Sequence, residues 1–273
     1  MQQDERVRDA TSRGSVPILM YHQVTPKPDR RFLKYAVKPD RFAQQMRWLA
    51  LTGHHAISMD ALLAHRAGAG TLPTRPVVVT FDDGYQDTYD HAVPVLLEHG
   101  FTAIFYLVGQ EVGHRSRWLE AERGLSLALF DWPTARRLEM DGFRCGSHAL
   151  THARLATLDG RESDRELMTS RKLLEDNLGR EVRDLAYPHG SYDDRVIRQA
   201  RAAGYRSACS VRIGRSPRLD DVMALHRIPV GGQESLATFI FRLRAGLSPR
   251  EWLRARRGGA RARVRADRAP GAR

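Results

Sequence analysis

Residues 76–84 have the sequence PVVVTFDDG, which contains the most strand-like run of the chain. Three valines precede a Thr-Phe pair, and β-branched and aromatic residues of this kind are typical of a buried strand. The run ends at two adjacent carboxylates, Asp82 and Asp83, followed by Gly84. We therefore predict a strand that places two acidic side chains at the turn beyond its carboxyl end.

Short apolar runs alternate with amphipathic segments on both sides of this strand, which is typical of β/α units around a mostly parallel sheet. Polar motifs directly follow several of these runs, and in parallel α/β barrels this edge carries the active site. The pattern predicts an α/β fold with about seven strands. Further strands are predicted at residues 16–21, 55–58, 102–109, 143–147, 182–187 and 205–210, and helices from about residue 40 and at 86–99, 134–140, 163–177 and 193–203.

Length and composition are those of a globular protein. The chain has 273 residues, a formal net charge of +12 and two cysteines. A chain of this length can bury a core without disulfides, so we expect Cys145 and Cys209 to be free thiols. No run approaches the roughly 18 apolar residues of a membrane helix, and residues 1–15 contain no apolar stretch typical of a signal peptide. We therefore expect a cytoplasmic protein, or an extracytoplasmic one if the N-terminus is incomplete.

The positive charge is concentrated at the C-terminus. Residues 242–273 contain 11 Arg against Glu251 and Asp267, a net charge of +9. We expect a polar, disordered segment at 1–15, one domain at 16–241 and an Arg-rich tail at 242–273. Such a tail is either solvated or in contact with an anionic surface. We expect no nucleic-acid binding, because Trp252 is the only aromatic residue of the tail.

The paired carboxylates Asp82 and Asp83 need an explanation because adjacent negative charges repel. Keeping both ionised requires a cation or basic partners nearby. A pair that caps the N-terminus of the next helix is the structural alternative.

Two histidines, His148 and His152, lie four residues apart immediately after the strand predicted at 143–147. On a helical turn this spacing places both rings on one face, where they can reach the same ion, although a chance pair is the alternative. With one carboxylate they would form a three-ligand site with open positions, as in catalytic metal centres. If Asp83 binds the metal, Asp82 is close enough to take a proton from the metal's water.

Together the motifs resemble those of the polysaccharide deacetylases with a NodB-homology domain, carbohydrate esterase family 4. The resemblance covers about residues 16–240 and implies a distorted (β/α) barrel of about seven parallel strands. Two further stretches, LMYH at 19–22 and RFAQQMRWL at 41–49, are similar to the exopolysaccharide deacetylase branch, which acts on poly-N-acetylglucosamine. The motifs that carry the resemblance are TFDDG at 80–84, Ser147-His148 through His152, and AYPHG at 186–190.

The resemblance implies a role for each matching residue. Asp82 matches the catalytic base, and Asp83, His148 and His152 match the metal ligands. Zinc suits two imidazoles and one carboxylate, and the same set accepts Co²⁺ or Ni²⁺. Tyr187, Pro188 and His189 match one wall of the sugar-binding groove.

The sequence departs from the family pattern at two positions. The family often has an arginine that orients the base two residues before the proline of the third motif, where this chain has Ala186. The late Leu-x-His motif, which supplies the general acid, is met only loosely by Ala224-Leu225-His226. We expect His226 to be the acid, with His22, His189 or water as the alternatives.

These features predict a metal-dependent hydrolase that removes N-acetyl groups from a polysaccharide containing N-acetylhexosamine, with Asp82 as the base that activates a metal-bound water. A related amidase or esterase acting on peptidoglycan or a small amide fits the same residues. Two histidines and one carboxylate also describe non-haem iron oxygenases, in which Asp82 would have no role. A non-catalytic protein that binds glycans or polyanions is the remaining alternative.

Overall fold

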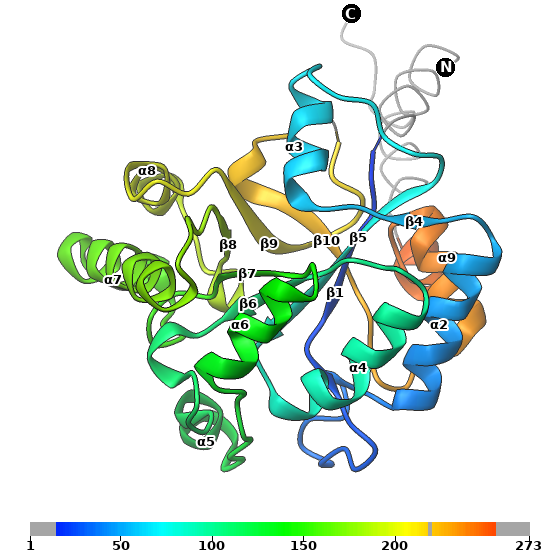
Figure 1. Cartoon of the computed structure of the whole chain (residues 1–273), viewed down its shortest axis with the longest axis horizontal. Helices are drawn as coiled ribbons and strands as arrows, with labels where there is room; N and C mark the ends of the chain where they lie inside the picture. Colours follow the sequence, from blue (N-terminus) through cyan, green and yellow to red (C-terminus); the bar gives the residue numbers. More distant parts are fainter. Residues whose placement is uncertain (1–14, 218–219, 255–273) are drawn as a thin grey trace, which may run out of the picture.

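The computed structural model describes residues 15–217 and 220–254 (Figure 1). Its strands form a closed barrel in which every pairing is parallel, and the last strand is bonded to the first. The ring contains seven strands, which confirms the predicted α/β barrel. In order around the ring these are β1 (Ile18–Tyr21), β10 (Leu225–Pro229), β9 (Ser207–Ile213), β8 (Asp184–Ala186), β7 (Arg144–Ser147), β6 (Ile104–Leu107) and β5 (Pro76–Asp83), which pairs again with β1.

Helices surround the barrel, and short elements extend its ends (Figure 1). β4 (His55–Ala56) pairs with the start of β5, while β2 (Gln23–Val24) and β3 (Ala36–Val37) form a separate two-stranded sheet. The α-helices are α2 (Pro39–Leu51), α3 (Met59–Arg66), α4 (Gln86–Glu98), α5 (Arg117–Arg123), α6 (Trp132–Met140), α7 (Gly160–Leu178), α8 (Asp194–Ala202) and α9 (Leu236–Ala245); the 3-10 helices are η1 (Gly109–Glu111), η2 (Leu155–Thr157), η3 (Pro188–Gly190) and η4 (Val222–Ala224). Among the described residues, no helix is long and apolar enough to cross a membrane.

Side-chain caps fix where several helices begin. The side chains of Asp131, Asp159 and Asp193 accept hydrogen bonds from backbone N–H groups in the first turns of α6, α7 and α8. These bonds satisfy donors that have no partner within the helix. The caps therefore fix the residue at which each of these helices begins.

The alternation of side chains along β5 explains how the site is placed. Val77, Val79 and Phe81 pack in the large core beneath the surrounding helices. Val78 belongs to a second cluster, which fills the barrel interior and is closed at the amino ends of the strands by Met59 of α3. Because successive side chains point to opposite faces, Asp82 shares the inward face with Val78.

The predicted end of the domain at residue 241 requires correction, and most residues of the two predicted terminal segments lie outside the described residues. α9 continues through Ala245, and its residue Leu243 is buried in the core. The boundary that we predicted after Phe241 therefore cuts a packed helix, and the first residues of the expected tail belong to the domain. The remaining calls for a disordered segment and a tail fall mostly on residues 1–14 and 255–273, which lie outside the described residues.

Because Gly146 of β7 has no side chain, it leaves space inside the barrel for the ring of Tyr106. A Cβ atom at this position would lie 2.7 Å from two atoms of the Tyr106 ring and 2.9 Å from the carbonyl oxygen of Asp184. The Tyr106 ring in turn lies beneath the guanidinium of Arg227, 5.9 Å from ring centroid to Cζ. The packing of the interior therefore requires glycine at position 146.

We expect Gly146→Ala to lower the free energy of unfolding by about 1–3 kcal/mol, the usual cost of overpacking a core. The matched control is Gly70→Ala, because its Cβ would meet atoms of Ala64 and His65 at ordinary contact distances of 3.5 to 3.9 Å. Urea denaturation of both variants measures the difference. Equal stability of the two variants would contradict the packing argument.

Candidate metal centre and active site

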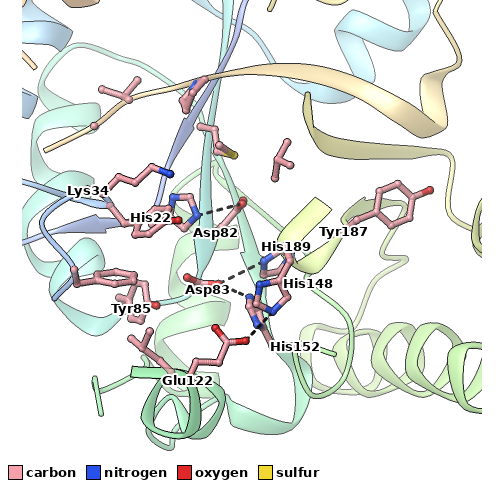
Figure 2. Close-up of a pocket in the computed structure, with 18 of the residues that line it drawn as sticks. His22, Lys34, Asp82, Asp83, Tyr85, Glu122, His148, His152, Tyr187 and His189 are labelled. Carbon is pink, nitrogen blue, oxygen red and sulfur yellow. Dashed lines mark ion pairs between the residues drawn. The ribbon is translucent and has the colours of Figure 1, made fainter. Parts of the chain in front are cut away.

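A cavity of about 560 Å³ lies at the carboxyl ends of the barrel strands. Its wall includes Met20 of β1, Asp82 of β5 and Val211 of β9. Figure 2 shows side chains from these separate segments around one space. The cavity gathers most of the residues that the sequence singled out.

Three predicted ligands, Asp83, His148 and His152, lie together on the floor of this cavity, and all three are buried. Oδ1 of Asp83 is 3.4 Å from Nε2 of His148 and 3.3 Å from Nε2 of His152 (Figure 2). Two atoms that each lie about 2.1 Å from one tetrahedral ion are separated by about 3.4 Å. The spacing therefore fits a shared divalent metal.

The hydrogen bonding around these residues also fits a metal. Nδ1 of His148 lies 2.7 Å from the carbonyl oxygen of Ala186 and donates to it, which leaves the Nε2 lone pair facing Asp83. Metal-binding histidines commonly have their second nitrogen fixed in this way. Among the described residues, Oδ1 of Asp83 is buried and accepts no hydrogen bond, as expected of an atom reserved for a ligand.

The segment from His148 to His152 is a loop, so the helical turn that we expected at this spacing is wrong. Ala149 and His152 adopt positive φ angles of 60° and 68°, which turn the second ring back toward the first. Asp83 and His189 have positive φ as well, 78° and 57°. Four of the five described non-glycine residues with positive φ therefore lie at this site, where such strain is commonly concentrated.

Glu166 of α7 holds this loop in place. Its carboxylate accepts hydrogen bonds from the backbone N–H groups of Leu150 and Thr151 at 2.9 and 3.0 Å. It accepts a third from the Thr151 hydroxyl at 2.7 Å. These bonds compensate for the strained conformation and fix the position of His152.

His152 is oriented by ring packing. Its Nδ1 is buried and has no hydrogen-bond partner among the described residues. The Trp118 ring stacks on the His152 ring at 4.7 Å between centroids, and the His189 ring meets it edge-on at 4.5 Å. Nε2 of His189 lies 3.3 Å from Oε1 of Glu122. Burial, together with the charge of His152, lowers the pKa of His189 to about 4.

Helix α5, which supplies Trp118 and Glu122, was not predicted from the sequence. It has only seven residues, which is too short for a helical period to be recognised. The aromatic and acidic residues of RWLEAER at 117–123 were the only available signal.

The second carboxylate, Asp82, forms a buried ion pair with Arg227 of β10. Two hydrogen bonds of 2.7 Å join the guanidinium to the two carboxylate oxygens. Arg227 is fully buried, and it also donates to Oγ1 of Thr80 and to the carbonyl oxygen of Ser210. Sequence reasoning missed Arg227, which contacts Asp82 from β10, whereas the motif position at which we looked for an arginine is Ala186 of β8.

The surrounding charges set the ionisation of Asp82. Burial raises the pKa of Asp82, but the charge and hydrogen bonds of Arg227, together with His148 and His22, hold this pKa below its usual range. Burial also opposes ionisation of Asp83, and the nearby histidines likewise hold its pKa low. Both carboxylates are therefore ionised, with basic partners on each, as the paired charges required.

His22 and His226 lie in different surroundings. His22 lines the cavity, with its Nε2 4.0 Å from Oδ2 of Asp82 and its ring 4.9 Å from that of Tyr35 (Figure 2). His226 is not among the residues that line the cavity, and its Nε2 lies 3.7 Å from Oδ2 of Asp220. The inward side chain of this strand is that of Arg227. The structure therefore brings His22 to the site and leaves His226 outside it.

The three residues predicted to form one wall of the sugar-binding groove lie in different surroundings. His189 lines the cavity directly, as described above. Tyr187 also lines it, but its ring stacks on Tyr192 at 4.8 Å and points away from the histidines (Figure 2). Pro188 is buried and is not among the lining residues.

The rest of the cavity has two contrasting walls. One is apolar and includes Val211 and Ile213, which are each 42% exposed. The other combines Trp118 and Tyr35 with cationic side chains such as Arg123. Flat aromatic faces beside polar groups are suited to an extended ligand with both apolar and hydroxylated surfaces.

Comparison with known proteins identifies the family of the chain. The family model for polysaccharide deacetylase matches residues 69–208, just over half of the chain. YxkH of Bacillus subtilis (strain 168), whose name places it among the polysaccharide deacetylases, is 26% identical over 226 residues, which cover 83% of this chain and 75% of the relative.

Two further proteins extend the likeness. The poly-beta-1,6-N-acetyl-D-glucosamine N-deacetylase of Staphylococcus epidermidis is 24% identical over 210 residues, covering 70% of this chain and 71% of the relative. The solved structure of IcaB from Ammonifex degensii is 25% identical, with a TM-score of 0.70, over 85% of this chain and 97% of that one. The chain therefore belongs to the polysaccharide deacetylase family of hydrolases.

Proposed function

We propose that this deacetylase removes N-acetyl groups from a polymer of N-acetylglucosamine in a reaction that depends on a divalent metal. The observation that carries the proposal is the convergence of Asp83, His148 and His152 beside an ionised, unligated Asp82. The poly-beta-1,6-N-acetyl-D-glucosamine substrate in the name of a relative supports the choice of polymer.

Asp83, His148 and His152 would hold the metal, and zinc suits their donor atoms best. When bound, the ion supplies Lewis acidity toward the acetamide carbonyl and the attacking water. Asp82 accepts the proton of that water, because it is the ionised carboxylate next to the ligands. Arg227 keeps the Asp82 carboxylate oriented and charged through its paired hydrogen bonds.

His22 supplies the proton that the departing amine requires. Its Nε2 faces the cavity from the side of Asp82, opposite His148 and His152 (Figure 2). A general acid must lie within reach of the leaving group, and His226 lies outside the cavity. We therefore move the role of acid from His226 to His22.

Removal of one ligand tests the metal site. We expect His148→Ala and His152→Ala to lose stoichiometric zinc and deacetylase activity, because each leaves only two protein ligands. The matched control is His226→Ala, which removes an imidazole outside the cavity. Metal content after dialysis, measured by elemental analysis, is the readout. Full zinc occupancy in His148→Ala would refute the ligand assignment.

Replacement of the base tests the chemistry. We expect Asp82→Asn to bind zinc and lose about 10²- to 10⁴-fold in turnover, the usual contribution of general-base assistance. The same change leaves Arg227 buried without a counter-charge, so the free energy of unfolding should fall by about 3–5 kcal/mol. Turnover per bound zinc, measured well below the melting temperature, separates the two effects. Turnover within twofold of the parent would indicate another base.

Replacement of each candidate acid in turn distinguishes His22 from His226. We expect His22→Ala to lower turnover on an acetylated glucosamine oligomer about 10²-fold or more. Turnover of an activated ester by the same variant should fall much less, because the leaving group of the ester needs no protonation. His226→Ala should leave both rates close to those of the parent. A loss confined to His226→Ala would reverse the assignment.

The substrate class is tested by acetate release from a matched panel. Poly-β-1,6-N-acetylglucosamine, chitin oligomers, peptidoglycan and an O-acetylated glycan present different linkages to the same site. We expect the first to give the highest kcat/KM. A clear preference for peptidoglycan or for the O-acetylated glycan would contradict the proposed substrate and would leave the assignment of the metal site unchanged.

A further inference from the structure

A second cavity lies at the opposite end of the barrel from the active site. Its volume is about 300 Å³, and it includes Pro17 and Pro76, which lie at the amino ends of β1 and β5. The remaining wall comes from α2, the segment after it, the segment after β9, and α9. The other lining residues are Trp48, Thr52, His54, Arg75, Arg215, Leu243 and Arg244.

The charge of this cavity is positive. Arg75, Arg215 and Arg244 line it, and no Asp or Glu is among the lining residues. Within the part of the chain that the structure describes, none of these three arginines forms an ion pair with a carboxylate.

Backbone carbonyls hold two of these side chains in place. Arg75 donates to the carbonyl oxygen of Thr52, and Arg215 donates through Nε and a terminal nitrogen to that of Ser15. A guanidinium has five N–H donors, so both retain donors for a ligand. Arg75 also has a φ of 47°, and it is the one described non-glycine residue with positive φ outside the active site.

Among residues 15–217 and 220–254, no carboxylate offsets the effect of burial on Arg215. Burial lowers the pKa of this guanidinium. Burial and then the charges of Arg75 and Arg244 lower the pKa of His54. Cations held together in this way repel one another, and a bound anion would relieve the repulsion.

We propose that this cavity binds an oxyanion of the phosphate class, as a phosphate ester. Guanidinium groups match phosphate oxygens through paired hydrogen bonds, and three of them can neutralise a doubly charged group. The cavity has the size of a small-ligand site. Trp48 and Leu243 provide an apolar wall for the remainder of the ester. The site is separate from the deacetylase chemistry and does not depend on the proposed substrate.

Binding of inorganic phosphate to the full chain provides the first test. At constant ionic strength, phosphate should shift the His54 ring resonances in NMR spectra and raise the His54 pKa, because a nearby anion favours the protonated ring. We expect the triple variant R75Q/R215Q/R244Q to bind phosphate at least tenfold more weakly. The single variant Arg244→Gln changes an exposed side chain and should weaken binding without affecting the fold.

The matched control removes the same charge elsewhere. R161Q/R165Q/R198Q changes three exposed arginines of α7 and α8, none of which lines the cavity. It should bind phosphate like the parent. Failure of the parent to bind phosphate would overturn the proposal. Equal loss of phosphate affinity in the two triple variants would also overturn it, because the loss would then come from net charge alone.

Vesicles distinguish the two sources of the phosphate group. Vesicles containing phosphatidylglycerol are compared with phosphatidylcholine vesicles in a sedimentation assay. If the parent and the control variant bind the anionic vesicles and R75Q/R215Q/R244Q does not, a lipid headgroup supplies the phosphate. If phosphate binds but no vesicle does, a soluble phosphate ester is the ligand. Either result supports the site.

Discussion

The buried ion pair between Asp82 and Arg227 is the interaction on which the site depends. An isolated carboxylate inside the barrel would be neutralised or would destabilise the fold by several kcal/mol. Arg227 prevents this, and its bonds to Thr80 and Ser210 connect β10 with β5 and β9. The same contacts therefore hold three strands together and keep a base ionised at the floor of the cavity. Neither partner can be replaced alone without leaving a buried charge.

The two histidines of the candidate metal site, His148 and His152, are held by different physical means. His148 follows a strand and is fixed by a hydrogen bond to the neighbouring strand, so its position is as rigid as the barrel. His152 lies in a strained loop and depends on Glu166 below it and on the Trp118 ring against it. The barrel thus fixes His148, and α5 with α7 supports His152. Variation in those two helices can therefore shift His152 without replacing any of the three proposed ligands.

Local patterns in the sequence predicted the barrel and the order of its strands along the chain. They also singled out Asp82, Asp83, His148 and His152, which the structure brings together, because each motif directly follows an apolar strand. Arg227 could not be found in this way, since its partner is 145 residues away and no local pattern connects them. The position of His226 depends on the same contact: once Arg227 points into the barrel, its neighbour in the strand points outward. The turn that brings His152 to His148 depends on positive φ angles, which no spacing rule predicts.

The closure of the ring has a consequence for how the chain folds. β1 is the first barrel strand to be synthesised, yet it bonds to β5 and to β10, whose residues Ile228 and Pro229 are made about 200 residues later. Such distant pairings make folding slow and leave a strand edge exposed in the meantime. Throughout synthesis up to Arg227, Asp82 also lacks its counter-charge. The ring can therefore close only after β10 has been made, so the whole barrel depends on the last of its seven strands.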